Sequence, residues 1–304
     1  MIRYVKHDDI DKERWDECIQ HSASPLIYAK AVYLDHMAGE WDALVMDDYR
    51  AVMPLTWRSK FGIKYLYQPA FTQQLGVFAK KELYVELKLT ELFINECKRY
   101  FNFAEINLNE SNSVEGLLCR TNFVLALDLS HDQRRAGYKT SFQQHLTKAS
   151  KQNLLYRSTT MFDEIVRSFS GQQRFKMRSV KRSDYKKFST LCSVLSVHGM
   201  CIAREVISNN EAVARVILLK DEKRIYNIMS FITAHGRELR ANHFLYDSIL
   251  NEFSNTGMLF DLEGSDVPGV RDFYAAFGGV DRPYYFLRYN HLHPLLRWGK
   301  KVIG

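Results

Sequence analysis

The sequence predicts an α/β (α+β) protein built from two copies of one domain. Residues 88–111 and 244–266 both read as a helix followed by a short strand, and each contains an Asn-Glu pair. The pairs begin at Asn95 and Asn251, 156 residues apart, and no gap separates helix from strand in either copy. The chain of 304 residues is long enough for two domains of ordinary size. A repeat this long indicates a duplicated α/β domain, unlike the short periods of solenoids.

The N-terminal part of each copy supports the duplication. Residues 41–57 and 213–233 each read as strand, charged turn and strand, which is the pattern of a hairpin. A helix is expected before each hairpin, at residues 28–37 and 185–195. The order helix, hairpin, helix, strand, helix, strand therefore occurs twice.

A basic segment lies between the two copies. Residues 133–187 hold 14 Lys and Arg but only three acids, although the whole chain carries a net charge of +7. Such a run is typical of a solvated helix face, and the functional alternative is attraction of a phosphate-rich partner such as a nucleotide cofactor or RNA. We expect an N-terminal domain at residues 1–135, a basic helical connector at 136–175 and a C-terminal domain at 176–304, whose last residues pack back on the first domain.

Composition and cysteine usage exclude several classes of protein. With 46% hydrophobic and 25% charged residues, the chain has the composition of a soluble globular protein. No apolar run has the length of a membrane span and the N-terminus lacks an apolar signal core, so we expect a cytoplasmic protein. The five cysteines are widely spaced without a CxxC pair, which indicates reduced thiols. His291 and His293 lack an acid or cysteine to complete a metal site, so no metal is expected.

The stretch LFDLEGSDVPGVRDFYAAFGG, residues 259–279, places two acids before a short helix. In a strand ending at Glu263, alternation puts Asp261 and Glu263 on one face, which suits water or a ligand. Pro268 suits the first turn of the following helix, and Tyr274 lies on its aromatic stripe. From the residues alone, the two carboxylates fit a general base and ordinary solvated acids equally well.

The element order and the motif FYAAFGG, residues 273–279, resemble the GNAT acyltransferases. Two copies in one chain resemble the Fem peptidyltransferases and related double-GNAT proteins of bacteria. LALDLS followed by YKTSFQQHLTKASKQNL is similar to their link between domains. The resemblance implies two tandem GNAT-like domains, each with a mixed, largely antiparallel sheet flanked by helices. It also implies an N-acyltransferase whose C-terminal domain holds the chemistry and whose N-terminal domain shapes an acceptor pocket.

The resemblance implies catalytic roles for three residues. In GNAT enzymes the thioester lies between two parallel strands that splay apart, and a tyrosine on the next helix protonates the leaving coenzyme A thiolate. Tyr274 matches that tyrosine, and Glu263 or Asp261 would be the base. A backbone N–H of residues 225–233 would stabilise the oxyanion. The first copy has Leu118 in place of Tyr274, so only the second copy keeps the full set.

The acyl donor is either an acyl-CoA such as acetyl-CoA or an aminoacyl-tRNA. GRELRANHFLYDS occupies the place of the GNAT pyrophosphate loop but lacks both glycines of the pattern R/Q-x-x-G-x-G/A. Fem enzymes carry a lysine where this chain has Tyr274, so neither family pattern is complete. The cofactor contacts implied by the resemblance are Arg237, Arg240, Asn242, Ile228 and Ser230.

Residues 60–78 follow the first hairpin and are rich in aromatic and amide side chains. Fem relatives place acceptor contacts in this part of the first domain, and a loop packed against the sheet is the alternative. The residues expected to contact an amine acceptor, such as a small molecule, sugar or peptide, are Trp57, Arg58, Tyr67, Gln73 and Gln74.

Two rival functions fit the same sequence. A non-catalytic double-GNAT scaffold would explain the missing glycines. An RNA-binding protein would use the basic middle segment and would bind RNA in a salt-sensitive way without needing Glu263 or Tyr274. Retention of the proton-handling groups in only one copy favours the enzyme.

Overall fold

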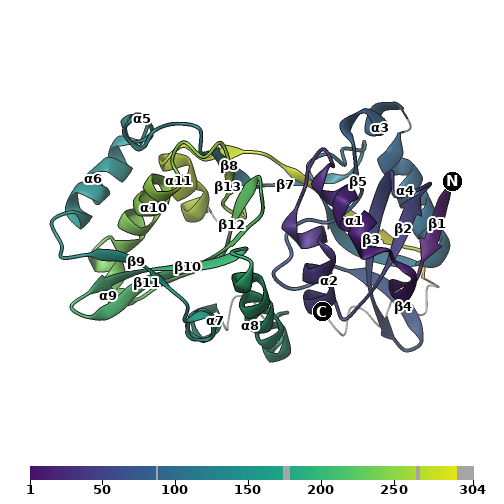
Figure 1. Ribbon diagram of the computed structural model, residues 1–304, viewed down its shortest axis with the longest axis horizontal. Coiled ribbons are helices and arrows are strands. Elements are labelled where there is room, and N and C mark those ends of the chain that lie inside the picture. The colour runs from purple at the N-terminus through teal and green to yellow at the C-terminus, as the bar shows by residue number, and fades with distance from the viewer. Residues whose placement is uncertain (87, 174–178, 265–267, 293–304) are drawn as a thin grey trace. The chain divides into compact units, whose positions relative to one another are not determined.

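The computed structural model describes residues 1–86, 88–173, 179–264 and 268–292. The chain divides into two compact units. The first unit contains Met1–Arg120 and Pro283–Gly304, and the second contains Thr121–Arg282. Each unit has its own mixed sheet with helices on both faces (Figure 1). The predicted fold class, two mostly antiparallel sheets flanked by helices, is confirmed.

The sheet of the first unit has strand order β1-β2-β3-β4-β6-β15-β7, and β5 pairs with β3. Its strands are β1 (Ile2–Val5), β2 (Glu40–Met46), β3 (Ala51–Lys60), β4 (Ile63–Tyr67), β5 (Phe78–Ala79), β6 (Phe103–Leu108), β7 (Leu118–Arg120) and β15 (Tyr284–Asn290). Its α-helices are α1 (Lys12–Gln20), α2 (Ala31–Met37), α3 (Lys81–Glu86) and α4 (Leu89–Tyr100). Leu89, Phe93 and Cys97 of α4 recur every four residues and are fully buried against the sheet, which fixes this helix on one face. The predicted hairpin at residues 41–57 is β2 and β3.

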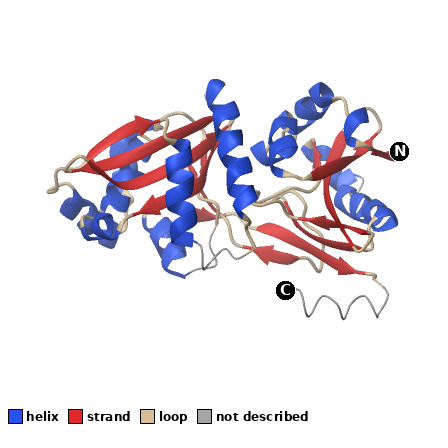
Figure 2. Ribbon diagram, turned by 90° about the horizontal axis from the view of Figure 1, so that it is seen from below, coloured by secondary structure: helices blue, strands red, loops and turns tan. Residues whose placement is uncertain are grey.

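The sheet of the second unit has strand order β14-β8-β13-β12-β11-β10-β9. Its strands are β8 (Phe123–Ala126), β9 (Leu155–Thr159), β10 (Cys201–Ser208), β11 (Glu211–Lys220), β12 (Arg224–Ile232), β13 (Leu259–Asp261) and β14 (Val280–Asp281). Its helices are α5 (His131–Ala136), α6 (Thr140–Ala149), α7 (Phe162–Gln173), α8 (Arg182–Val197), α9 (Ala234–Glu238), α10 (Ala241–Glu252) and α11 (Pro268–Ala276). Helices α6, α10 and α11 cover one face of the sheet, and α7 and α8 contact the other (Figures 1 and 2).

The two copies exchange their last strands. Strand β8, from the first half of the chain, pairs with β13 and β14 in the second unit. Strand β15, from the end of the chain, pairs with β6 and β7 in the first unit. The structure therefore divides the chain at residues 120 and 282, whereas the sequence placed the boundary at residue 135.

Residues 136–175 belong to the second unit and are not a separate connector. Phe142 and Leu146, four residues apart on α6, are buried in the core of that unit. Strand β9 pairs with β10 at the edge of its sheet. The many basic side chains of this segment are compatible with a helix that buries only a narrow apolar stripe. The domain boundary therefore lies elsewhere, at residues 120 and 282.

Candidate functional site

The parallel strands β12 and β13 separate in the second unit. Their ladder holds three residue pairs and ends where Tyr226 faces Asp261. Strand β12 continues to Ile232, whereas β13 stops at Asp261. On the other side of β12, the β11 ladder shifts register between Ile217 and Leu218, whose partners are Met229 and Asn227. The strand is therefore bulged at the point where its neighbour leaves it, and bulges of this kind redirect side chains beside functional sites.

Three polar side chains meet where the strands separate. The amide Nδ2 of Asn227 on β12 donates to the hydroxyl of Tyr246 on α10 at 2.8 Å and to that of Tyr274 on α11 at 3.4 Å. Asn227 is 5% exposed, and its Oδ1 is buried without a hydrogen-bond partner. The Tyr246 hydroxyl also hydrogen bonds with Tyr274 and with Ser230 of β12. One amide thus orients two phenol groups inside an aromatic core.

Tyr274 stays protonated in this environment. Burial raises the pKa of Tyr274 well above its ordinary value, and the neighbouring Tyr246 and the Glu263 carboxylate raise it further. A phenol of this kind keeps its proton at neutral pH and is an O–H donor to groups that lie beside it.

Glu263 does not lie in a strand. Strand β13 ends at Asp261, and Glu263 has a left-handed backbone with φ of 60°. Its N–H donates to Oδ1 of Asp261 at 3.1 Å, which closes a turn of the Asx type. The expectation that the two carboxylates share a strand face is therefore wrong. The side chain of Glu263 is partly exposed and influences Tyr274, so these two predicted residues do lie close together.

Asp261 is fully buried in an ion pair. Its Oδ2 accepts a hydrogen bond from Nη1 of Arg224 at 2.8 Å, and both side chains are at most 4% exposed. Burial raises the pKa of Asp261, and the Arg224 guanidinium opposes that rise. A carboxylate committed to a buried guanidinium has no access to an incoming amine, which disfavours Asp261 as a general base.

The predicted cofactor residues lie on β12 and around the start of α10. Ile228 and Ser230 are partly buried on β12 beyond the strand separation. Arg240 is the N-cap of α10, with a left-handed backbone (φ 59°) and no side-chain hydrogen bond to the helix amides. Asn242 follows it with a buried Oδ1 that lacks a partner. Arg237 belongs to the short helix α9, whose start is capped by the Thr233 side chain.

The corresponding place in the first unit is filled by its own chain. Strands β4 and β6 are parallel over two residue pairs, and residues 68–77 then run beside β6. Leu75 N–H donates to the carbonyl of Asn107 at 2.9 Å, and Asn107 Nδ2 donates to the carbonyl of Gln73 at 2.8 Å. Leu118, which matches Tyr274 in the repeat, lies on β7. No helix like α11 occurs between β6 and β7, whose intervening residues are all described.

The predicted acceptor residues fall into two groups in the first unit. Arg58 stacks over the Tyr67 ring at 3.9 Å, and Trp57 beside them donates from Nε1 to Asp42 at 2.8 Å. Gln73 and Gln74 lie in the segment that fills the strand split, and Gln74 is only 1% exposed. Burial disfavours Gln74 as an acceptor contact, whereas Trp57 and Arg58 are partly exposed on β3.

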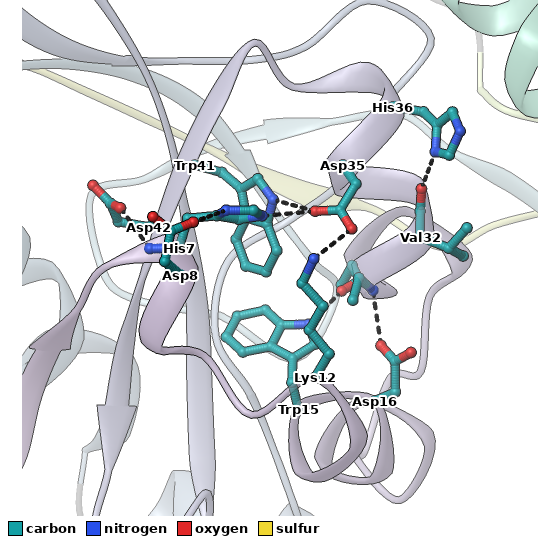
Figure 3. Close-up of polar contacts among 12 residues, drawn as sticks. His7, Asp8, Lys12, Trp15, Asp16, Val32, Asp35, His36, Trp41 and Asp42 are labelled. Atoms are coloured by element: carbon teal, nitrogen blue, oxygen red, sulfur yellow. Dashed lines mark hydrogen bonds and ion pairs between the residues drawn. The ribbon is translucent and has the colours of Figure 1, made fainter.

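A second polar network lies near the N-terminus of the first unit. Figure 3 shows His7, Lys12 and Trp41 converging on the Asp35 carboxylate of α2. The distances to its oxygens are 2.9 Å from His7 Nε2, 2.7 Å from Lys12 Nζ and 3.0 Å from Trp41 Nε1. The hydrogen bond that the His7 ring donates to the Asp35 carboxylate raises the pKa of His7. The network joins the first turn of the chain to α1, α2 and β2, and we assign it a structural role.

Sequence reasoning missed Asn227 and Tyr246. Asn227 interrupts the apolar residues of IYNIM, 225–229, and a polar residue inside a buried strand is a detectable signal. Tyr246 lies on α10 among apolar residues, and its sequence pattern is the same as that of an ordinary core tyrosine.

Comparison with known proteins relates the fold to several solved structures. FemX matches with a TM-score of 0.69 at 9% identity, covering 97% of this chain and 99% of that one. A tandem GNAT protein from the clavulanic acid biosynthesis pathway matches with a TM-score of 0.52 at 12% identity, covering 95% and 98%. The chain has a double-GNAT, Fem-like fold. L-PGS from Bacillus licheniformis shares it with a TM-score of 0.54 at 11% identity over 94% of both chains.

Two further comparisons gave no match. No protein-family model and no curated protein matches the sequence. At identities this low, the double-GNAT likeness establishes the architecture, and function has to be argued from the site. In the described part of the chain, no group of three or more His, Cys, Asp and Glu side chains is placed to hold a metal ion, and no helix is long and apolar enough to cross a membrane.

Proposed function

We propose that this double-GNAT protein is an N-acyltransferase whose reaction takes place where β12 and β13 separate. The observation that carries the proposal is the Tyr274 hydroxyl, which Asn227 holds at that separation. In the first unit the chain itself bonds to β6 where the strands part, and Leu118 matches Tyr274, so the proposal assigns the chemistry to the second unit.

The reaction requires three events that these residues supply. The acceptor amine attacks the acyl carbonyl and transfers a proton to Glu263, the partly exposed carboxylate of the site. A backbone N–H in the bulged part of β12, at Ile228, donates to the oxyanion of the tetrahedral intermediate. The bond to the leaving group then breaks, and the Tyr274 O–H protonates the departing thiolate or alkoxide. The net result is an amide and a neutral leaving group, and the proton on Glu263 then returns to the Tyr274 oxygen to restore both residues.

The donor is an acyl-CoA or an aminoacyl ester of tRNA, and the proposal favours acyl-CoA. Arg237, Arg240 and Asn242 surround the start of α10, where the anionic part of such a donor would bind. Trp57 and Arg58 of the first unit are proposed as acceptor contacts, since both are partly exposed beside Tyr67.

A thermal-shift titration tests donor binding first. Acetyl-CoA, longer acyl-CoAs and free coenzyme A are added to the wild type and to Arg240→Ala. A ligand that binds only the folded protein raises its Tm with concentration. We expect a shift that Arg240→Ala abolishes. If no coenzyme A species shifts the Tm, the acyl-CoA donor is rejected, and the same titration is repeated with aminoacyl-tRNA.

Turnover then tests the role of Tyr274. Release of free thiol from the donor is followed in the presence of amine acceptors, for Tyr274→Phe and for the control Tyr289→Phe. The control removes a buried hydroxyl in the first unit that has no hydrogen-bond partner. We expect Tyr274→Phe to lower kcat by about 10²-fold or more with donor binding retained, and Tyr289→Phe to be unchanged. Donor binding without turnover in the wild type would instead favour the non-catalytic scaffold.

A further inference from the structure

Strands β3 and β4 are joined as a hairpin (Figure 1), and its outer part extends past the neighbouring strands. The ladder between β2 and β3 ends at Trp57, and the ladder between β4 and β6 begins at Leu66. Within the described part of the chain, the strand residues between these two positions pair only with one another. We call residues 58–65 the arm. Most of its side chains are exposed, so they are available for a role outside the core.

The tip of the arm holds an aromatic residue that the turn itself does not favour. Phe61 and Gly62 form the two-residue loop of the hairpin, with φ of 51° and 76°. A positive φ at both positions is what a type I′ turn requires, and Asn-Gly is the sequence that meets this requirement best. Phe61 instead places a bulky side chain in the left-handed region, with 83% of its surface exposed. Neither the turn nor the core explains a phenylalanine at this position.

The other side chains of the arm make it positively charged. Arg58, Lys60 and Lys64 are its cations, and its sequence contains no Asp or Glu. An acid, Glu40, occurs opposite Trp57 at the base of the arm. Lys60 and Lys64 are both exposed, and Lys64 Nζ lies 3.7 Å from the centroid of the Trp57 ring. The arm therefore presents an apolar tip with cations directly behind it.

An anionic lipid surface matches this order of groups. The interface of a bilayer accepts an aromatic side chain at the level of the acyl boundary, and anionic headgroups attract Lys and Arg. Strand residues rise by about 3.3 Å each, so the cations from Lys60 back to Arg58 lie within about 10 Å of the tip. Interfacial segments enter a bilayer to a similar depth of about 5–10 Å.

A single-stranded nucleic acid is the other polyanion that binds cations beside aromatic rings. It stacks its bases on open ring faces. The two aromatic rings at the base of the arm each carry a cation on one face: Lys64 lies over Trp57, and Arg58 lies over Tyr67 at 3.9 Å. The exposed ring is Phe61 at the tip, which suits insertion into an interface better than a row of stacked bases.

We propose that the arm docks the protein on an anionic phospholipid bilayer, with the Phe61 ring in the interface and the three cations at the headgroups. The inference goes beyond the proposed acyl transfer and does not depend on it. The docking is peripheral and reversible, because one ring and three charges are too few for stable anchoring. Each cation near such a surface strengthens binding by about fivefold. Salt weakens this attraction.

Co-sedimentation with vesicles tests the charge of the arm. The full chain is mixed with vesicles of phosphatidylcholine alone or with about one quarter phosphatidylglycerol. We expect binding to the anionic vesicles, weakened by NaCl, and little binding to the neutral ones. Lys60→Gln/Lys64→Gln should lower the affinity by about 25-fold, whereas the control Lys80→Gln/Lys81→Gln, which removes two exposed lysines of the same unit, should stay within about twofold of the wild type. Arg58 is left unchanged because the proposed function uses it as an acceptor contact.

Phe61→Asn separates docking from folding. It gives the loop the sequence Asn-Gly, which the turn prefers, so the Tm should equal or exceed that of the wild type. Vesicle binding should nevertheless fall by at least about fivefold, because the apolar tip is lost. The matched control, Val85→Gln on α3, removes an apolar side chain that is 84% exposed and should leave vesicle binding unchanged.

Tryptophan fluorescence tests whether the tip enters the bilayer. Phe61→Trp should shift its emission to the blue on anionic vesicles and should be quenched by brominated acyl chains. The inference is overturned if the wild type does not bind anionic vesicles, or if either Phe61→Asn or Lys60→Gln/Lys64→Gln binds them as the wild type does. Binding of a single-stranded oligonucleotide that both variants lose, without binding to vesicles, would assign the arm to nucleic acid instead.

Discussion

Asn227 organises the candidate site at the scale of single residues. It is the strand residue that reaches both tyrosine hydroxyls, and its two amide hydrogens match those two acceptors. Its unpaired Oδ1 shows that stability alone does not explain an amide at this position, because burying a polar atom without a partner is unfavourable. We infer that the amide is kept for the orientation of Tyr274.

Replacement of Asn227 by leucine should separate activity from stability. Asn227→Leu removes two hydrogen bonds, each with a net worth of about 1 kcal/mol, but it also removes the unpaired Oδ1. We expect the free energy of unfolding to fall by no more than about 2 kcal/mol. Loss of a proton donor lowers turnover by about 10²-fold. Asn227→Leu leaves the Tyr274 hydroxyl in place but removes its fixed orientation, so we expect turnover to fall by at least about tenfold. Denaturant unfolding and the thiol-release assay measure both effects, and full turnover would exclude Asn227 from the site.

For the Arg224–Asp261 ion pair we expect the opposite of Asn227: its loss should reduce the stability of the fold. Asp261→Asn removes the buried carboxylate that pairs with Arg224, and breaking such a pair costs about 3–5 kcal/mol. The double variant Arg224→Met/Asp261→Leu removes both charges and should recover most of that loss. Urea unfolding of the three proteins checks this. An Asp261→Asn protein with wild-type stability and no turnover would restore Asp261 as a candidate base.

At the scale of elements, α9 is fixed tightly against the hairpin of β11 and β12. A Cβ built on Gly236 would lie 2.3 Å from the carbonyl oxygen of Val213 and 3.0 Å from Cγ1 of Ile232. The glycine therefore permits the close approach that positions the start of α10 beside β12.

Two glycine-to-alanine substitutions test this contact. Gly236→Ala should lower the free energy of unfolding by about 1–3 kcal/mol, since α9 must move to relieve the overlap. Gly171→Ala on α7 is the matched control, because its Cβ would meet nothing within 4 Å. That change should raise stability by up to about 1 kcal/mol through helix propensity. Both variants are measured by thermal and by denaturant unfolding. If Gly236→Ala and Gly171→Ala change the stability equally, the close approach at Gly236 is refuted.

The elements were easier to predict from sequence than their pairing. The repeat located the two hairpins as well as α4 and α10, since these depend on local periodicity. The return of the chain end to the first domain was expected, but the matching transfer of β8 to the second sheet was not, because an apolar strand fits either sheet equally well by alternation. Glu263 was misplaced because its left-handed φ depends on the turn closed by Asp261. Tyr274 was found from the family motif, whereas Asn227 was missed although it is a polar residue within a buried strand.

At the scale of the whole molecule, His7 in the first unit and His243 in the second should contribute to stability with opposite pH dependence. The pKa of His7 is raised, so its stabilising contribution is complete below its unfolded value of about 6.5 and is lost as the pH rises through the folded pKa. The pKa of His243 is lowered to about 4, so the unfolded chain binds the proton more readily, and stability is lost as the pH falls from about 6.5 towards 4.

Melting curves at several pH values, for the wild type and for two variants, separate these effects. Relative to the wild type, His7→Gln should be more destabilised at about pH 5.5 than at about pH 8. His243→Gln should show the reverse, with its deficit shrinking or changing sign at low pH. Parallel curves for all three proteins would mean that neither histidine is linked to folding.

The strand exchange predicts which part of the chain folds alone. Residues 121–282 are continuous and contain every strand of their sheet, including β8. Residues 1–120 lack β15, which lies between β6 and β7 and buries Leu287 and Tyr289 on the core. We expect the fragment 121–282 to be monomeric and to melt cooperatively. The fragment 1–120 should expose the unpaired edge of β6 and aggregate, as open strand edges do.

Joining residues 283–304 to residue 120 through a flexible linker supplies β15 and should restore a soluble, cooperatively melting first unit. Circular dichroism and size-exclusion chromatography of the three fragments check this. A well-folded fragment 1–120 would show that β15 is dispensable and that the exchange contributes little to the stability of the first unit.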